Sequence, residues 1–204
     1  MKSDKQKQRK QKVSEVKIFN VPLALGEIKE NITFSTNTPS KPSKEQIINQ
    51  AFKFHSQGNI AEAEKYYKYF LNQGFEDHRV FSNYGSLLKS LGKSKEAEGC
   101  YRKAIKLNPN YANAHYNLGN ILNELGKLKD AEISLRKAIE LKPDFPTAHS
   151  NLGNVLSDLG KSIEAEISQR KAIELNPDFA MAHYNLGNIL LDLGNLQEAE
   201  ISTR

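Results

Sequence analysis

The sequence AHYNLGN occupies residues 114–120, recurs unchanged at residues 182–188, and stands with one substitution, as AHSNLGN, at residues 148–154. Each copy begins 34 residues after the one before it, and the same spacing divides the chain into units that begin at residues 44, 78, 112, 146 and 180. A period of about 20–50 residues is typical of solenoids and other repeat architectures. The sequence therefore predicts a repeat domain over residues 44–204.

Each unit is predicted to contain two helices. In the third unit, apolar residues follow the helical period over residues 115–125 and again over residues 128–141. Gly126 lies between the two halves, where a left-handed backbone can end a helix without strain, and Pro143 follows the second half, where it stops a helix. Because these turns are short, consecutive helices must pack antiparallel, and the predicted fold class is all-α.

Small residues at fixed places of the unit limit how closely the helices approach. The eighth place of four units is glycine: Gly85, Gly119, Gly153 and Gly187. A larger side chain there would push packed helices apart. Gln169 replaces the usual aromatic or apolar residue of the second helix, so we expect softer packing in the fourth unit.

The pattern resembles the tetratricopeptide repeat (TPR) over residues 44–204. The matching places in the third unit are His115, Leu118, Gly119, Leu122, Ala131, Leu135, Ala138 and Pro143. The resemblance implies a right-handed superhelix, an α-solenoid of antiparallel helix pairs, in which the first helices line a concave groove. The repeats look most similar to those that precede the catalytic region of O-linked N-acetylglucosamine transferases, in which groove asparagines hold the substrate peptide.

A polar stripe follows one face of each predicted first helix. The sixth place of every unit is asparagine: Asn49, Asn83, Asn117, Asn151 and Asn185. The ninth place of the last three units is also asparagine (Asn120, Asn154 and Asn188), and the thirteenth is acidic (Glu124, Asp158 and Asp192). The fifth place adds Tyr116 and Tyr184. Residues three and four apart share a helix face, so the stripe is predicted to face the groove.

An asparagine amide presents two donors and one acceptor, so a row of amides can hydrogen-bond the backbone of an extended peptide. The resemblance assigns the peptide-holding position to Asn117, Asn151 and Asn185. We therefore predict a non-catalytic scaffold that binds an extended polypeptide through an asparagine ladder. The alternative interpretation is that the amides satisfy polar groups between packed helices, or that the copies match because the repeats duplicated recently.

Nothing in the pattern indicates catalysis. His115, His149 and His183 occupy the same place in successive units, and packed helices lie about 8–10 Å apart, so this row cannot converge on one metal ion. No nucleophile stands beside them with a base. We expect no enzyme activity, metal or cofactor from these residues.

A second hypothesis, favoured by the end of the chain at Arg204, is that the repeats are the substrate-recruiting arm of a larger transferase whose catalytic domain is absent.

The second helices are predicted to expose charged pairs on a solvated convex face. Glu132 and Arg136, for example, are four residues apart on one helix surface.

The chain ends inside the second helix of the fifth unit. In a stack that buries each repeat against the next, this end leaves apolar surface bare, so we expect either a truncated product or self-association through this end.

The first 43 residues are predicted to form a mostly disordered basic arm. They contain nine Lys or Arg and four Asp or Glu, so they account for the whole net charge of +5. Residues 36–43 read as a Ser/Thr/Pro linker. The alternative is that the apolar residues within 16–25 dock on the repeats.

Partners and compartment follow from what the sequence lacks. The basic arm could tether nucleic acid or another anionic surface, but no aromatic residue precedes Phe19 to stack on a base, which argues against nucleic acid. Cys100 is the single cysteine, which rules out an internal disulfide and fits a reducing compartment. No apolar stretch is long enough for a signal peptide or a membrane span. We expect a cytoplasmic protein whose partner is a protein or peptide.

Overall fold

The computed structural model of the protein describes residues 41–195, and all the regular secondary structure in that part is helical. Its nine helices are α1 (Lys44–Ser56), α2 (Ile60–Asn72), α3 (His78–Ser90), α4 (Ser94–Leu107), α5 (Ala112–Glu124), α6 (Leu128–Leu141), α7 (Pro146–Asp158), α8 (Ser162–Leu175) and α9 (Ala180–Asp192). The first helix of each unit begins where the 34-residue period restarts. The predicted all-α repeat fold is confirmed.

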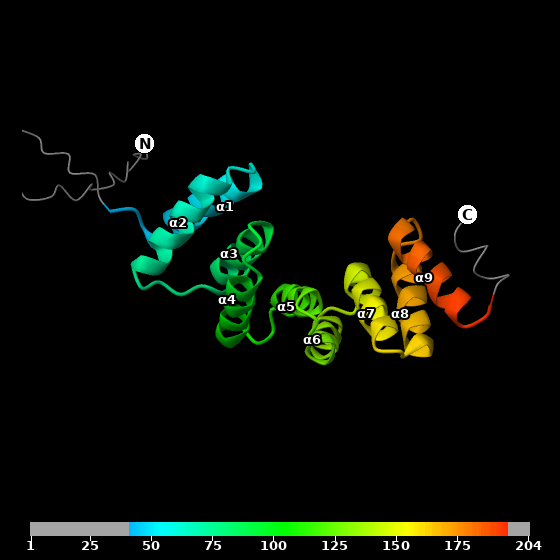
Figure 1. The fold of residues 1–204 in the computed structure, drawn as a ribbon. Coiled ribbons are helices and arrows are strands. Elements are labelled where there is room, and N and C mark those ends of the chain that lie inside the picture. The colour runs from blue at the N-terminus through cyan, green and yellow to red at the C-terminus, as the bar shows by residue number, and fades with distance from the viewer. Residues whose placement is uncertain (1–40, 196–204) are drawn as a thin grey trace, which may run out of the picture. The chain divides into compact units, whose positions relative to one another are not determined.

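The helices pack as antiparallel pairs, each joined by a short turn (Figure 1). The second helix of each pair also packs on the first helix of the next pair. First helices of neighbouring pairs contact each other directly, whereas within the described part no Cα atom of one second helix lies within 8 Å of another second helix. Because only the first helices come this close, they form the inner side of the stack and the second helices form the outer side.

Glycine at the eighth place permits this close packing. A Cβ atom added at Gly119 would lie 2.6 Å from Cγ of Leu135, which is fully buried in α6. In the second unit, a Cβ atom added at Gly85 would lie 2.7 Å from the ring of Tyr101. In these two units the second helix therefore rests directly on the backbone of the first.

The turns follow the sequence signals, except that one second helix ends by a different mechanism. Gly126 has a φ of 71°, the left-handed conformation predicted for the end of a first helix. The second helices α4, α6 and α8 end just before a proline, but the first unit has Phe75 at the place of that proline. There Gly74, with a φ of 73°, ends α2 instead.

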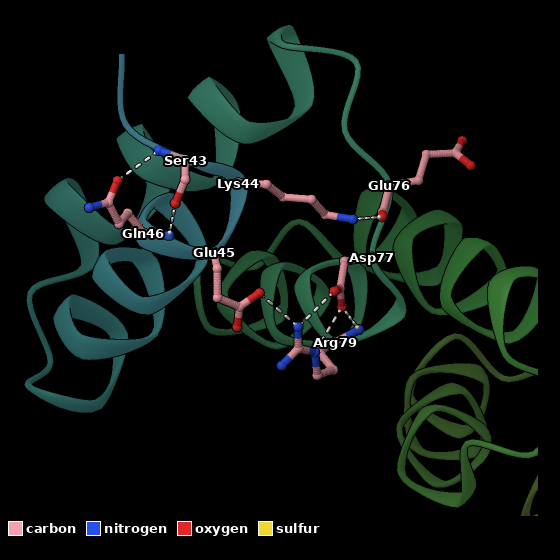
Figure 2. Close-up of polar contacts among 7 residues, drawn as sticks. All are labelled: Ser43, Lys44, Glu45, Gln46, Glu76, Asp77 and Arg79. Carbon is pink, nitrogen blue, oxygen red and sulfur yellow. Dashed lines mark hydrogen bonds and ion pairs between the residues drawn. The ribbon is translucent and has the colours of Figure 1, made fainter. Parts of the chain in front are cut away.

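The first helix of the stack is closed by its own cap. The Ser43 hydroxyl oxygen accepts a hydrogen bond from the backbone N–H of Gln46, and the Gln46 side chain accepts one from the backbone N–H of Ser43 (Figure 2). This reciprocal arrangement satisfies two backbone donors that α1 would otherwise leave unpaired. Helix α1 therefore begins at a defined residue.

A second polar group joins the starts of α1 and α3 (Figure 2). Lys44 donates a hydrogen bond from Nζ to the backbone oxygen of Glu76 at 2.7 Å. Arg79 donates to Asp77 at 2.8 Å and to Glu45 at 3.5 Å. The hydrogen bonds and charge of Arg79 outweigh the opposing effect of burial and hold the pKa of Asp77 below its usual value. These contacts hold the first unit against the second.

Ion pairs link successive units along the outer side. A lysine just before each of α4, α6 and α8 pairs with a glutamate of the preceding second helix: Lys93 with Glu64 at 3.7 Å, Lys127 with Glu98 at 2.9 Å, and Lys161 with Glu132 at 2.8 Å. The same glutamates also pair within their own helices, as Glu132 does with Arg136 at 2.9 Å. The Glu132–Arg136 pair was predicted from sequence, whereas the pairs between units were not.

These ion pairs lower the pKa values of Glu98 and Glu132. The hydrogen bond from Lys161, together with Arg136, lowers the pKa of Glu132 despite its partial burial. Lys127 and Arg102 lower the pKa of Glu98 in the same way. The outer side also carries largely exposed apolar residues, Ile133, Ile163 and Ile167, so it is less uniformly charged than predicted.

Two predictions concern parts of the chain that the structure does not describe. The basic arm lies outside the described residues apart from residues 41–43. The end of the fifth unit, for which bare apolar surface was predicted, lies at residues 196–204 and is also outside the described residues. Met181, Tyr184 and Leu191 of the preceding α9 are exposed. Disorder of the arm and self-association remain predictions.

Candidate functional site

A cleft of about 280 Å³ opens on the inner side of the stack, between α5 and α7. Its lining residues are Lys89 of α3, Tyr116, Asn120, Asn123 and Glu124 of α5, Leu135 of α6, and Asn151, Asn154 and Val155 of α7. Five predicted groove residues therefore meet in one place: Tyr116, Asn120, Glu124, Asn151 and Asn154. The cleft is rich in amide side chains from two neighbouring first helices.

Three amide side chains each make hydrogen bonds within the protein through only one of their two polar atoms. Asn151 donates from Nδ2 to Oδ1 of Asn120 at 2.8 Å and to the Tyr116 hydroxyl at 3.3 Å, which joins α7 to α5. Asn154 accepts at Oδ1 from Nε2 of Gln169 at 2.8 Å. Within residues 41–195, no hydrogen bond is made by the Nδ2 groups of Asn120 and Asn154 or by Oδ1 of Asn151. The cleft thus has two amide donors and one amide acceptor available to a ligand.

Two further contacts shape this cleft. The Tyr116 ring lies against the Phe145 ring, with centroids 4.7 Å apart. Nζ of Lys89 lies 2.5 Å from Oε1 of Glu124, which pairs α3 with α5. A partly exposed pair contributes only about 0–1 kcal/mol to stability, but it brings the two opposite charges that border the cleft together. The chemistry of the cleft is therefore hydrogen bonding by neutral amides.

The sixth-place asparagines do not form a uniform row. Asn117 donates to the Ser82 hydroxyl at 3.5 Å, and Asn83 donates to a backbone oxygen of its own helix at 2.9 Å. Asn49 is exposed, whereas Nδ2 of Asn185 is buried without a hydrogen-bond partner among the described residues. The interhelical role, which was the alternative interpretation, therefore holds for Asn117, as it does for Asn151.

Four other predicted groove residues lie outside the cleft. Tyr184, Asn188, Asp158 and Asp192 are all exposed. Each sits on α7 or α9, farther toward the C-terminal end of the described part.

Sequence reasoning missed the part that three polar residues, in or next to the cleft, play at the site. Lys89 and Asn123 both occupy the twelfth place of their units, next to the thirteenth place that was singled out, so a wider stripe would have included them. Gln169 was recognised as a departure from the pattern, but its contact with Asn154 depends on how α8 packs against α7.

The three repeated histidines form hydrogen bonds to the turns between units. Nε2 of His115, His149 and His183 donates to the carbonyl oxygen of the proline that ends the preceding unit, at 2.9, 3.0 and 2.8 Å. Residues 41–195 contain no group of three or more His, Cys, Asp or Glu side chains arranged to hold a metal ion. In the same part of the chain, no helix has both the length and the apolar character needed to cross a membrane.

Comparison with protein families identifies the repeats. A model described as TPR repeat matches residues 85–126 and 119–160, and two models described as tetratricopeptide repeat match residues 146–179 and 169–201. A curated relative, the uncharacterized protein YgeG of Escherichia coli K12, is 34% identical over 67 residues. That match covers 33% of this chain and 39% of YgeG, so it spans about two fifths of the relative.

Solved structures share the fold. MamA (residues 41 to the end) from Desulfovibrio magneticus RS-1 is 23% identical, with a TM-score of 0.72 over 78% of this chain and 90% of that one. YrrB, described as a TPR protein with an unusual peptide-binding site, is 24% identical, with a TM-score of 0.69 over 78% of this chain and 82% of that one. These similarities show the fold. The family matches, which together run from residue 85 to residue 201, show that the chain belongs to the tetratricopeptide repeat proteins.

Proposed function

We propose that the protein is a non-catalytic scaffold that binds an extended polypeptide along the inner side of its repeats, with the cleft between α5 and α7 as the central contact. The observation that carries this proposal is the set of half-used amides. Asn120, Asn151 and Asn154 each have one end held by an internal hydrogen bond and the other end unpaired at the cleft. Amides held in this way lose little side-chain entropy when a ligand binds.

An extended main chain supplies the matching groups. Each peptide residue offers one N–H donor and one C=O acceptor, and in an extended segment both groups of a residue point to the same edge. The Nδ2 groups of Asn120 and Asn154 can donate to main-chain carbonyls, while Oδ1 of Asn151 can accept from a main-chain N–H. Tyr116 adds a rigid ring with apolar contact area beside these amides.

Other features agree with a protein partner. YrrB, which shares the fold, is described as having a peptide-binding site. Lys89 and Glu124 pair with each other at the cleft, so the ligand needs no charged side chain at this point. The remaining predicted residues with exposed side chains, Asn49, Asn188, Tyr184, Asp158 and Asp192, would extend the contact along the inner side.

A transferase that uses such repeats as its recruiting arm would hold its substrate in the same cleft. The similarity to transferase repeats that the sequence suggested belongs with this alternative. Both hypotheses require the same amides to contact the polypeptide, so one set of variants tests that shared contact.

The experiment uses isosteric changes. Asn120→Asp and Asn154→Asp keep the oxygen that accepts the internal hydrogen bond and replace only the unpaired Nδ2 donor. The probe is a short uncharged peptide selected on the immobilised full chain from a random library, and affinity is measured by fluorescence anisotropy. Because each lost hydrogen bond is worth about 1 kcal/mol, the double variant should bind the probe about tenfold to thirtyfold more weakly.

The matched control is Asn113→Asp, which makes the same charge change at an exposed position of α5 outside the cleft. It should bind like the wild type, and all variants should keep the helical circular dichroism spectrum. The proposal would be wrong if no library peptide bound, or if the control and the cleft variants lost affinity equally.

A further inference from the structure

Gln169 is a buried amide at a place where the other complete units have a tyrosine or a leucine. Its side chain has no exposed surface, and it lies against Gly153 so closely that an added Cβ there would be 2.7 Å from Nε2. Nε2 donates to the backbone oxygen of Ser150 at 2.9 Å and to Oδ1 of Asn154 at 2.8 Å. A packing position of the repeat has therefore become a hydrogen-bond donor aimed at a cleft residue.

The third and fourth units orient their ninth-place amides in different ways. In the third unit, Leu135 cannot donate a hydrogen bond, and Oδ1 of Asn120 accepts from Asn151 of the next unit. In the fourth unit, Oδ1 of Asn154 accepts from Gln169 of its own unit. Both arrangements leave an Nδ2 group unpaired at the same cleft. Gln169 thus holds the ninth-place amide of its own unit, whereas the ninth-place amide of the third unit is held by Asn151 of the next unit.

This arrangement leaves polar atoms unpaired behind the cleft. By the register of the repeat, Asn185 is related to Asn154 as Asn151 is to Asn120, yet Asn185 makes no such bond, and Oδ1 of Asn154 accepts from Gln169 instead. Nδ2 of Asn185, Oγ of Ser150 and Oε1 of Gln169 are all buried without a hydrogen-bond partner in residues 41–195. Unpaired buried polar atoms lower stability, and proteins accept such losses mainly at functional sites.

We propose that Gln169 is a positioning residue of the cleft, which holds the Asn154 amide with its Nδ2 group available to the ligand without help from the next repeat. The proposal rests on the proposed function. The cleft then presents a fixed set of donors on Asn120 and Asn154 and one acceptor on Asn151. Its ligand is one edge of an extended, unsubstituted main chain, and the residue that contacts Asn151 must have a free N–H, which excludes proline there.

The test combines Gln169→Leu with Asn185→Ala. Leucine is the residue at the same place in the third unit, so it fits the packing, and removing the Asn185 amide prevents it from replacing the lost donor. The double variant should bind the probe peptide about five- to tenfold more weakly. Asn185→Ala alone should bind like the wild type because Gln169 still holds Asn154.

Two comparisons separate a positioning role from a structural one. In an Asn154→Asp background, the double variant should cause no further loss of affinity, because the donor that Gln169 positions is already absent. Replacing single peptide bonds of the probe by N-methyl amides should reveal one residue whose methylation abolishes binding. Wild-type affinity of the double variant, an equal loss in the Asn154→Asp background, or tolerance of methylation at every position would overturn the proposal.

A measurement on the unliganded wild type tests the orientation directly. In nuclear magnetic resonance spectra, the Nε2 protons of Gln169 should exchange slowly with solvent, and the Nδ2 protons of Asn154 should exchange fast. The reverse pattern would contradict the role of Gln169 even if the peptide bound. If the Gln169 variants have no effect while Asn120→Asp and Asn154→Asp weaken binding, only the positioning role fails and the proposed function stands.

Discussion

Replacing Gly119 by alanine should destabilise the protein, although alanine is the better helix former. In an exposed helix interior this change stabilises by about 0.5–1 kcal/mol. At Gly119 the new Cβ would lie 2.6 Å from Cγ of Leu135 and 3.3 Å from the backbone oxygen of Ala131. Cγ is the branch point of a fully buried side chain, so relief requires α6 to move away from α5 and not merely a rotation of the leucine.

The expected magnitude follows from these two opposing effects. Overpacking a well-packed core costs about 1–3 kcal/mol, and after the gain in helix propensity the net loss is about 1–2 kcal/mol. The matched control is Gly99→Ala in α4, where no atom lies within 4 Å of the added Cβ and the residue is exposed. That control should gain about 0.5–1 kcal/mol. The same substitution therefore has opposite signs at two helical glycines.

Urea unfolding followed by far-ultraviolet circular dichroism measures both effects. The unfolding midpoint should fall for Gly119→Ala and rise for Gly99→Ala, with similar slopes for the two variants. If both midpoints moved in the same direction, the close approach of α6 to α5 would not be the reason for glycine at the eighth place.

Two further predictions concern titratable groups. Glu98 and Glu132 have lowered pKa values in the folded protein, so the stability they contribute is complete above their usual pKa of about 4.5 and is lost as the pH falls through the lowered folded value. The double variant Glu98→Gln and Glu132→Gln should therefore lose less stability than the wild type in acid, in urea unfolding measured between about pH 6 and pH 3; equal losses would show that these pairs contribute nothing. Burial, with a smaller effect of nearby Glu96, raises the pKa of Cys100 to about 11, so the folded protein should react with iodoacetamide at neutral pH far more slowly than the protein in urea does. Mass spectrometry measures the labelling, and equally fast labelling of the folded protein and of the protein in urea would contradict the burial of this thiol.

Local signals explain why the helix boundaries could be predicted. A glycine such as Gly126 or a proline such as Pro143 acts on its own backbone and its immediate neighbour, so its effect does not depend on the rest of the fold. The 34-residue period repeats these signals, and the observed first helices begin where each 34-residue unit begins. Where the signal changed, at Phe75, the neighbouring Gly74 ended the helix by another local mechanism.

The candidate site could be predicted only in part. Helical spacing placed Asn120 and Glu124 on one face of one helix, and the cleft contains both. The spacing did not reveal which amide atoms remain unpaired, because Asn151 bonds to Asn120 across 31 residues and Gln169 bonds to Asn154 across the turn between two helices. The ion pairs between units were missed for the same reason.

The sequence by itself determined the repeat period, the helices and the face on which the asparagines lie, since each of these follows from interactions within a few residues of the chain. Only the tertiary structure decided which asparagines bind to neighbouring helices and which keep a free donor or acceptor. An amide has a limited number of hydrogen bonds to make, and its partners here are set by the packing of α5, α7 and α8. The two asparagines of one heptapeptide therefore end in different states: Asn117 and Asn151 join helices, whereas Asn120 and Asn154 keep donors at the cleft.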